Sequence, residues 1–150
     1  KNLFMAYAHV AHDCIVGDDN VFANNSGIAG HVIIGNKVTI GALTTIHQFC
    51  QMGDYSFAGM NASITMDVPA YIKVASNPAR VVGLNAVGME RGGIDQDTIT
   101  YLKKAYKIIY RKGFNLKDAL EKLESSNLHA IEEVKTFINS IKSSKRGILR

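Results

Sequence analysis

The sequence predicts a mainly β protein, a parallel β-helix followed by an α-helical C-terminus. Three observations support this fold: a six-residue apolar period over residues 4–68, a break over residues 69–93, and helical apolar spacing over residues 94–150. The chain of 150 residues is 47% hydrophobic and 20% charged, which is typical of a folded globular protein. No apolar run approaches the roughly 18 residues of a membrane span, so no stable membrane insertion is expected.

The six-residue period defines the predicted β-helix. From Phe4 to Ile64 every sixth residue is apolar, and the next residue is Gly or Ala in eight hexads of ten. The fifth position is small in nine of ten, with Asn20 the exception. Each hexad of a parallel β-helix forms one short strand and one corner, and three hexads close a coil, so about three and a half coils are expected. Corner residues expected to tolerate left-handed backbone angles are Asp18, Asp19, Asn24, Asn25, Gly30 and Asn36.

The second half of the chain has a different pattern. Residues 69–93 contain two prolines and several glycines, so an irregular connector is expected there. Three helices should follow, the first two capped by Asp95 and Asn115 and the third carrying apolar residues over 128–141. The predicted divisions are therefore β-helix coils over 1–68, a connector over 69–93 and a helical domain over 94–150, which covers the open edge of the last coil.

Four of the five histidines are predicted to lie on one edge. Residues one coil apart stack at about 4.8 Å, which aligns the hexads beginning at Val10, Ile28 and Ile46. The polar residues of this edge are His9, His12, His31, His47 and Gln48. An imidazole here can act as a general base, and Asp13, next to His12, can fix its tautomer. Two or three of the histidines could instead bind zinc, although no fixed ligand motif such as HExxH is present.

The cysteines and the charge distribution indicate the cellular compartment and the kind of partner. Cys14 and Cys50 lie two coils apart, about 9.6 Å by the strand spacing, which exceeds the ~7 Å reach of a disulfide. They are interpreted as core fillers in a reducing compartment. Residues 1–93 carry five basic and six acidic residues, whereas residues 94–150 carry twelve and seven. The basic second half is either a docking surface for an acidic partner or a solvated surface.

Several stretches resemble the UDP-N-acetylglucosamine O-acyltransferases of lipid A biosynthesis. They are AHVAHDC (8–14), ANNSGIAGHV (23–32), IHQFC (46–50), DVPAY (67–71), NPAR (77–80), AYKIIYR (105–111) and RGILR (146–150). The resemblance covers the chain and matches the C-terminal part of the family, whose first coils are missing here. It implies a left-handed β-helix and a cytoplasmic homotrimer with sites between subunits. It also implies transfer of an (R)-3-hydroxyacyl group from acyl carrier protein to the sugar 3-hydroxyl, the first step of lipid A biosynthesis.

The resemblance also assigns roles to residues. It makes His12 the general base, Asp13 its acidic support and Gly30 the backbone donor to the thioester oxyanion. The positions that match substrate contacts are His9, His31, His47 and Gln48, with Asn85 and Arg91 at the nucleotide end. Gly92 stands where the family usually has a second arginine. Met60 matches the position that limits acyl length, so a shorter acyl chain is expected.

The resemblance also implies the partners of the protein. Acyl carrier protein brings the acyl group as a phosphopantetheine thioester, so no other cofactor and no metal are expected, and nucleic acid is not an expected partner. The predicted dock for this acidic protein is the basic cluster of Lys103, Lys104, Lys107, Arg111 and Lys112. Two alternatives stay open: a zinc enzyme resembling the γ-class carbonic anhydrases, and an inactive module that only assembles a trimer.

Overall fold

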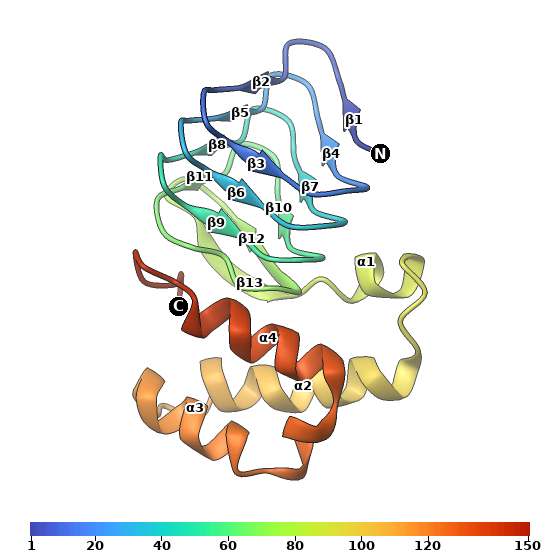
Figure 1. Cartoon of the computed structure of the whole chain (residues 1–150), viewed down its shortest axis with the longest axis vertical. Coiled ribbons are helices and arrows are strands. Elements are labelled where there is room, and N and C mark those ends of the chain that lie inside the picture. Colours follow the sequence, from blue (N-terminus) through green and yellow to red (C-terminus); the bar gives the residue numbers. More distant parts are fainter.

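The computed structural model describes all 150 residues and shows a parallel β-helix that stands on a layer of helices (Figure 1). The β-helix is built from strands of two residues each, separated by corners. These strands are β1 (Leu3–Phe4), β2 (His9–Val10), β3 (Ile15–Val16), β4 (Val21–Phe22), β5 (Gly27–Ile28), β6 (Ile33–Ile34), β7 (Thr39–Ile40), β8 (Thr45–Ile46), β9 (Gln51–Met52), β10 (Phe57–Ala58) and β11 (Ser63–Ile64). The prediction of a β-helix with a helical C-terminus is confirmed.

The strands form three flat faces, and each face collects every third strand. One face has the order β1-β4-β7-β10, the second β2-β5-β8-β11 and the third β3-β6-β9. Leu3 pairs with Val21, Val21 with Thr39 and Thr39 with Phe57, so each coil takes eighteen residues. Phe57 then pairs with Lys73, only sixteen residues on, because the hexad pattern fails after β11.

The repeated apolar positions form the core of the β-helix. All eight of them from Phe22 to Ile64 are at most 2% exposed. Phe4 and Val10 remain 48% and 38% exposed because the first coil has a neighbour on one side only. The exceptional Asn20 is also buried, and its amide donates to Gly35 O (2.9 Å) and accepts from Val38 N–H (2.7 Å). An asparagine therefore fits this small position because both ends of its amide are satisfied.

The corners recur with one left-handed residue each. Asp19 and Asn25 take left-handed angles as predicted, but Asp18, Asn24, Gly30 and Asn36 do not, because each stands one residue before the left-handed position. The residues that share the left-handed position form three columns: Tyr7, Asn25, Leu43 and Asn61; Asp13, His31 and Phe49; and Asp19, Lys37, Tyr55 and Tyr71. We call the second column with its neighbours the histidine edge and the third the lysine edge. Bulky residues are rare at such angles, and here hydrogen bonds between coils hold them, such as His31 N–H to His12 O (3.1 Å).

The prediction of an irregular connector over residues 69–93 was wrong. Strands β12 (Ile72–Ala75) and β13 (Arg80–Leu84) form an antiparallel hairpin, and β12 extends the first face by pairing with β10. Helix α1 (Ala86–Arg91) follows, with Asn85 as its N-cap. Residues 72 and 74 are buried and residue 73 is exposed, which is an alternation too short to detect beside a six-residue period.

The remaining helices lie beneath the last coil (Figure 1). They are α2 (Gln96–Tyr110), α3 (Leu116–Glu124), the 3₁₀ helix η1 (Asn127–Ala130) and α4 (Glu132–Lys142). Asp95 and Asn115 accept hydrogen bonds from the backbone of Thr98 (2.9 Å) and Asp118 (2.8 Å), so both predicted caps are confirmed. The third predicted helix is divided, because Ile131 is extended between η1 and α4. None of these helices combines the length and apolar character needed to cross a lipid bilayer.

The end of the chain is fixed to the β-helix through a buried carboxylate. Asp67 is 2% exposed, and it accepts hydrogen bonds from Gln51 N–H (2.8 Å) and the Ser144 hydroxyl (2.6 Å). Its backbone also donates to Gly147 O (3.0 Å) and accepts from Leu149 N–H (2.8 Å). The tail, the last coil and α4 therefore form one packed unit below the histidine edge.

Candidate active site

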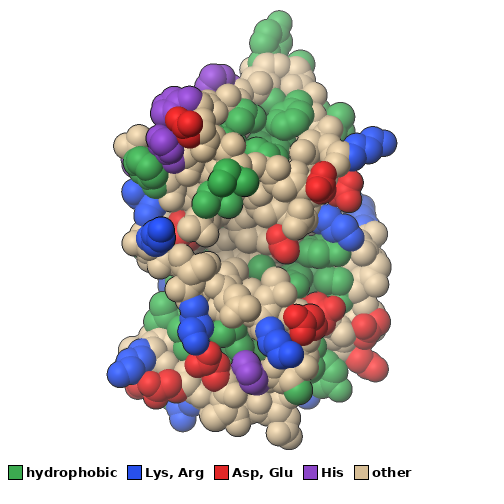
Figure 2. Space-filling model, viewed as in Figure 1, with side chains coloured by type: hydrophobic (Ala, Val, Ile, Leu, Met, Phe, Trp, Pro, Cys, Tyr) green, Lys and Arg blue, Asp and Glu red, His purple; other side chains and the backbone are tan.

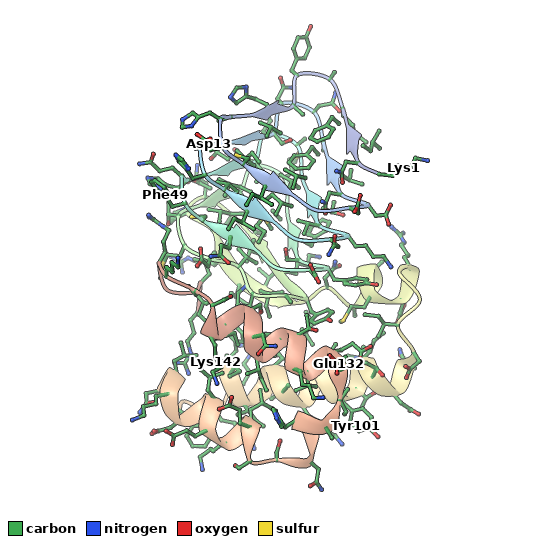
Figure 3. All side chains as sticks on the ribbon, viewed as in Figure 1. Lys1, Asp13, Phe49, Tyr101, Glu132 and Lys142 are labelled. Atoms are coloured by element: carbon green, nitrogen blue, oxygen red, sulfur yellow. The ribbon has the colours of Figure 1, made fainter.

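The histidine edge brings two of the predicted histidines and the predicted acid into one cluster. The His12 and His31 rings meet edge to face, with centroids 5.1 Å apart, and the Phe49 ring stacks on His31 at 4.8 Å. Figure 2 shows histidine side chains gathered beside an acidic side chain on the upper left of the molecule. In Figure 3, Asp13 and Phe49 mark the same edge, two coils apart. The stacking of one coil on another thus converts distant sequence positions into neighbours.

Asp13 joins the two imidazoles. Its Oδ2 lies 2.8 Å from His12 Nδ1 and 3.8 Å from His31 Nε2. The hydrogen bond from His12 and the nearby His31 charge hold the Asp13 pKa below its ordinary value. An ionised carboxylate can only accept, so in the neutral form of the His12 ring the proton is on Nδ1 and the lone pair is on Nε2. This arrangement suits a general base at Nε2.

Gly30 lies directly beneath the His12 ring. A Cβ at position 30 would sit 2.6 Å from Cε1 and 2.7 Å from Nε2 of His12, so no side chain fits without moving the ring. The Gly30 N–H donates no hydrogen bond within the chain. The residue that packs against the His12 ring therefore also has a free backbone donor.

The other predicted residues of this edge lie around the cluster. His9 lies in β2, and His47 and Gln48 follow β8; all three are exposed. His47 Nδ1 lies 3.1 Å from Gln48 O. Gln48 shares a column with His12 and Gly30, two coils and one coil away respectively. These three side chains can contact a ligand that extends along the edge.

The same cluster contains a possible set of metal ligands. One ligand atom from each of His12, Asp13 and His31 lies within 4.8 Å of the others. Two imidazoles and one carboxylate are suitable donors for zinc. A zinc enzyme, one of the alternatives considered from the sequence, would therefore bind its ion at this cluster.

A cavity lies at the lysine edge, between the first face and helix α1. Its volume is about 580 Å³, and it is lined by Asp19, Lys37, Thr39, Phe57, Lys73, Asn85, Val87, Gly88, Arg91 and Gly92. Arg91 is exposed and ends α1, whereas Asn85 is buried. The Asn85 amide donates to Tyr55 O (2.8 Å) and accepts from Gly88 N–H (3.1 Å), so it shapes the cavity wall. Asn85 and Arg91 thus line one cavity.

The cavity and the histidine cluster lie on different edges of the same chain. In Figure 3, Asp13 and Phe49 project on one side and Lys1 on the other, and in Figure 1 α1 lies on the side of Lys1. Asp19 donates its N–H to Lys1 O (2.6 Å), which places the lysine edge there. Met60 precedes Asn61 of the remaining corner column and is 71% exposed. One chain therefore presents His12, the cavity and Met60 on separate edges.

Sequence reasoning missed several residues of these sites. Phe49 stacks on His31, and Lys37 donates to the Tyr55 hydroxyl (2.8 Å). In both cases the signal was present, because each pair is separated by one coil of eighteen residues. Lys73 gave no such signal, since the last coil is two residues shorter.

The fold and the histidine edge define a hexapeptide-repeat β-helix protein with a corner site and a C-terminal helical layer. The family model described as UDP N-acetylglucosamine O-acyltransferase, domain 2, matches residues 67–149. The chain belongs to this family.

Individual relatives of known name match nearly the whole chain. The protein of Ectopseudomonas mendocina called acyl-[acyl-carrier-protein]–UDP-N-acetylglucosamine O-acyltransferase is 43% identical over 149 residues, which are 99% of this chain and 57% of that protein. The solved UDP-N-acetylglucosamine O-acyltransferase of Moraxella catarrhalis has a TM-score of 0.95 at 46% identity, covering 99% of this chain and 58% of that one. The solved UDP-N-acetylglucosamine acyltransferase of Arabidopsis has a TM-score of 0.96 at 34% identity, covering 100% of this chain and 55% of that one. The chain thus spans just over half the length of these relatives.

Proposed function

We propose that this protein transfers an (R)-3-hydroxyacyl group from acyl carrier protein to the 3-hydroxyl of UDP-N-acetylglucosamine, the first step of lipid A biosynthesis. The acyl group arrives as a phosphopantetheine thioester, and the reaction takes place in the cytoplasm. One observation carries the proposal: Asp13 lies 2.8 Å from Nδ1 of His12, and Gly30, whose N–H is free, packs against the same imidazole ring. A base and an oxyanion donor at one point are what acyl transfer to a hydroxyl requires.

The mechanism follows from these groups. His12 Nε2 takes the proton of the sugar 3-hydroxyl while the oxygen attacks the thioester carbonyl carbon. The carbonyl oxygen becomes negative and accepts the Gly30 N–H, an interaction of about 2.7–4 kcal/mol in comparable sites. When the C–S bond breaks, the imidazolium returns its proton to the thiolate. Asp13 stabilises the imidazolium, and its lowered pKa keeps it ionised throughout.

The separation of the two edges supports a site formed between chains. We propose a homotrimer in which the histidine edge of one subunit faces the lysine-edge cavity of the next. His31, His9, His47 and Gln48 then contact the acyl and sugar groups, while Arg91 meets the nucleotide end. A closed threefold ring repeats this contact at every interface.

Met60 is proposed to limit the acyl chain. Its side chain is 71% exposed on its own subunit, which leaves it free to block a groove formed with a neighbour. A short donor should therefore turn over faster than a long one, and Met60→Gly should remove the difference. Equal rates for short and long donors in the parent protein would contradict this assignment.

The acyl carrier protein is proposed to dock on α2. The basic residues Lys103, Lys104, Lys107, Arg111 and Lys112 are all exposed on this helix or at its end. Attraction between this surface and an acidic carrier weakens with salt, because exposed charges are screened over about 10 Å at 0.1 M. A KM for the carrier that is independent of ionic strength would argue against the dock.

The test of the function compares His12→Ala with His129→Ala. His129 lies in η1 and is exposed, so its substitution controls for loss of an imidazole elsewhere. Loss of the general base should lower kcat by roughly 10²–10⁴-fold, with an unchanged far-UV circular dichroism spectrum. The control should retain the parent kcat. Normal turnover by His12→Ala would reject the assignment of the base.

A further inference from the structure

The histidine edge places three side chains that can bind metal around one point. Oδ2 of Asp13 lies 2.8 Å from Nδ1 of His12 and 3.8 Å from Nε2 of His31. One ligand atom from each of the three residues lies within 4.8 Å of the others, and no other group of three histidine, cysteine, aspartate or glutamate side chains in the chain is this close. The proposed reaction uses these groups as base, acidic support and substrate contact, and none of those roles requires a metal ion.

The distances within the cluster are near those of a zinc site. Zinc binds histidine nitrogen at about 2.0–2.1 Å and carboxylate oxygen at about 2.0–2.2 Å, so two ligands of a tetrahedral site are about 3.4 Å apart. The distance between Asp13 and His12 must therefore widen by about 0.6 Å, and that between Asp13 and His31 must shorten by about 0.4 Å. Small rotations of three exposed side chains supply such changes without any movement of the backbone.

The stacked coils hold the backbone beneath the cluster. The His31 N–H donates to His12 O (3.1 Å), and the Phe49 N–H donates to Gly30 O (3.2 Å). The Phe49 ring stacks on the His31 ring at a centroid distance of 4.8 Å and an interplanar angle of 10°, which limits the orientations of this imidazole. The ligands therefore project from fixed positions on two adjacent coils. A preorganised set of ligands loses less conformational entropy on binding than a flexible set does.

The donor atoms select the class of ion. Two imidazole nitrogens and one carboxylate oxygen suit zinc, whereas Mg²⁺ and Ca²⁺ prefer sets of oxygen ligands. All three side chains are exposed, so the remaining coordination position is open to water. Three protein ligands and an open position are typical of a site that exchanges its ligands, whereas structural zinc sites are closed by four protein ligands.

We infer that His12, Asp13 and His31 bind a zinc ion that blocks acyl transfer. The site rests on the geometry, and its effect on turnover rests on the proposed function, in which Nε2 of His12 needs a free lone pair. An ion on Nε2 takes that lone pair directly. An ion on Nδ1 leaves the proton of the neutral ring on Nε2, so the lone pair is lost in that case as well. Bound zinc is therefore an inhibitor and not a cofactor, and it must leave before the base can act.

The experiment measures Zn²⁺ binding to the metal-free protein by isothermal titration calorimetry, with the visible absorption of bound Co²⁺ as a second readout. We expect about one Zn²⁺ per chain. His31→Ala and Asp13→Asn should each weaken binding at least about tenfold, because even groups that only support metal ligands commonly contribute 10- to 100-fold. Two controls should keep the parent affinity: His47→Ala, which lies on the same edge outside the cluster, and His129→Ala in η1. Mg²⁺ at the same concentration should not compete.

The effect on turnover is measured with acyl carrier donor and UDP-N-acetylglucosamine. Zinc should abolish turnover by the parent protein, and a chelator should restore it. The zinc concentration that halves the rate should be at least about tenfold higher in His31→Ala, measured against the zinc-free rate of that variant. Equal half-inhibiting concentrations in the two proteins, or turnover that zinc leaves unchanged or increases, would overturn the inhibition.

The binding outcomes separate the site from the proposed reaction. No Zn²⁺ binding by the parent protein at submillimolar concentration, or an equal loss of affinity in His47→Ala and His31→Ala, would overturn the site. Zinc binding that depends on His31 and Asp13, in a protein that transfers no acyl group even when free of metal, would support the site and reject the proposed reaction. An equal unfolding midpoint of all variants without zinc confirms that the fold is intact.

Discussion

Substitution of Gly30 by alanine tests the geometry of the histidine edge most directly. The new methyl group would lie 2.6 Å from Cε1 and 2.7 Å from Nε2 of His12, where ordinary contacts begin at 3.4 Å. The ring must therefore retreat by about 0.8 Å. Gly30 has no left-handed backbone angle, so alanine adds no strain of its own, and its N–H is retained. A displacement of about 1 Å at a reacting group can lower the rate by roughly 10²-fold, which is the loss we expect in kcat.

The matched control is Gly27→Ala in the same coil. A Cβ at Gly27 meets no atom within 4 Å, so this substitution adds the same methyl group without a collision. Steady-state kinetics with acyl carrier donor and UDP-N-acetylglucosamine give kcat and KM for both variants, and thermal unfolding should place both within about 1 kcal/mol of the parent. Imidazole NMR signals of His12 should move only in Gly30→Ala. If both variants keep the parent kcat, the contact between Gly30 and His12 has no role in catalysis.

Three further effects follow from the charged and buried groups. Asp13→Asn should lower kcat by roughly 10²-fold or more, because the amide no longer fixes the His12 tautomer. Since the Asp13 pKa is lowered, the parent should show no loss attributable to this carboxyl until the pH falls below its ordinary value near 3.9. A loss of activity at higher pH that occurs in the parent but not in the variant would contradict this. Burial raises the pKa of the Cys50 thiol to about 11, so iodoacetamide at pH 8 should modify the half-buried Cys14 first, and equal labelling of both cysteines would refute this order. For the same reason the unfolding free energy should fall as the pH rises above the unfolded thiol pKa of about 8.5. Asp67→Asn should lower the unfolding free energy by about 1–3 kcal/mol, because the amide cannot accept all the hydrogen bonds the carboxylate accepts. An unchanged denaturation midpoint would show that the hydrogen bonds of Asp67 do not hold the tail on the β-helix.

The repeat was predictable because one geometric rule applies to every coil. The six-residue period placed Ile28, Ile34 and Ile40 in the core and aligned His12 with the coil that contains His31, and the structure has both. The period did not identify the left-handed residue of each corner. Composition favours Asn, Asp and Gly there, yet Leu43 and Phe49 take the same angles, because the hydrogen bonds between coils decide the backbone.

The cavity could not be predicted, because it depends on where the repeat ends. The last coil is two residues short, and that change of register brings Lys73 beside Phe57. The hairpin β12–β13 then directs α1 to the lysine edge, where Arg91 joins Lys37. Each of these steps depends on local packing after Ile64 and leaves no periodic trace in the sequence. Lys37 and Tyr55 share the spacing of one coil that would have linked them.

His12 and the cavity lie on separate edges, so two defective variants can together test whether a site forms between subunits. His12→Ala removes the base but keeps the cavity, and the double variant Lys37→Ala, Lys73→Ala keeps the base but weakens the cavity. If each site joins the histidine edge of one subunit to the cavity of the next, trimers co-expressed from both genes contain intact interfaces. With equal random mixing each side is intact with a probability of about one half, so about one quarter of the interfaces should be fully active. The assay is turnover at a UDP-N-acetylglucosamine concentration well below KM, with each variant alone as the control. Activity no greater than the mean of the two separate variants would mean that each chain completes its own site, and the proposed trimer would lose its catalytic role.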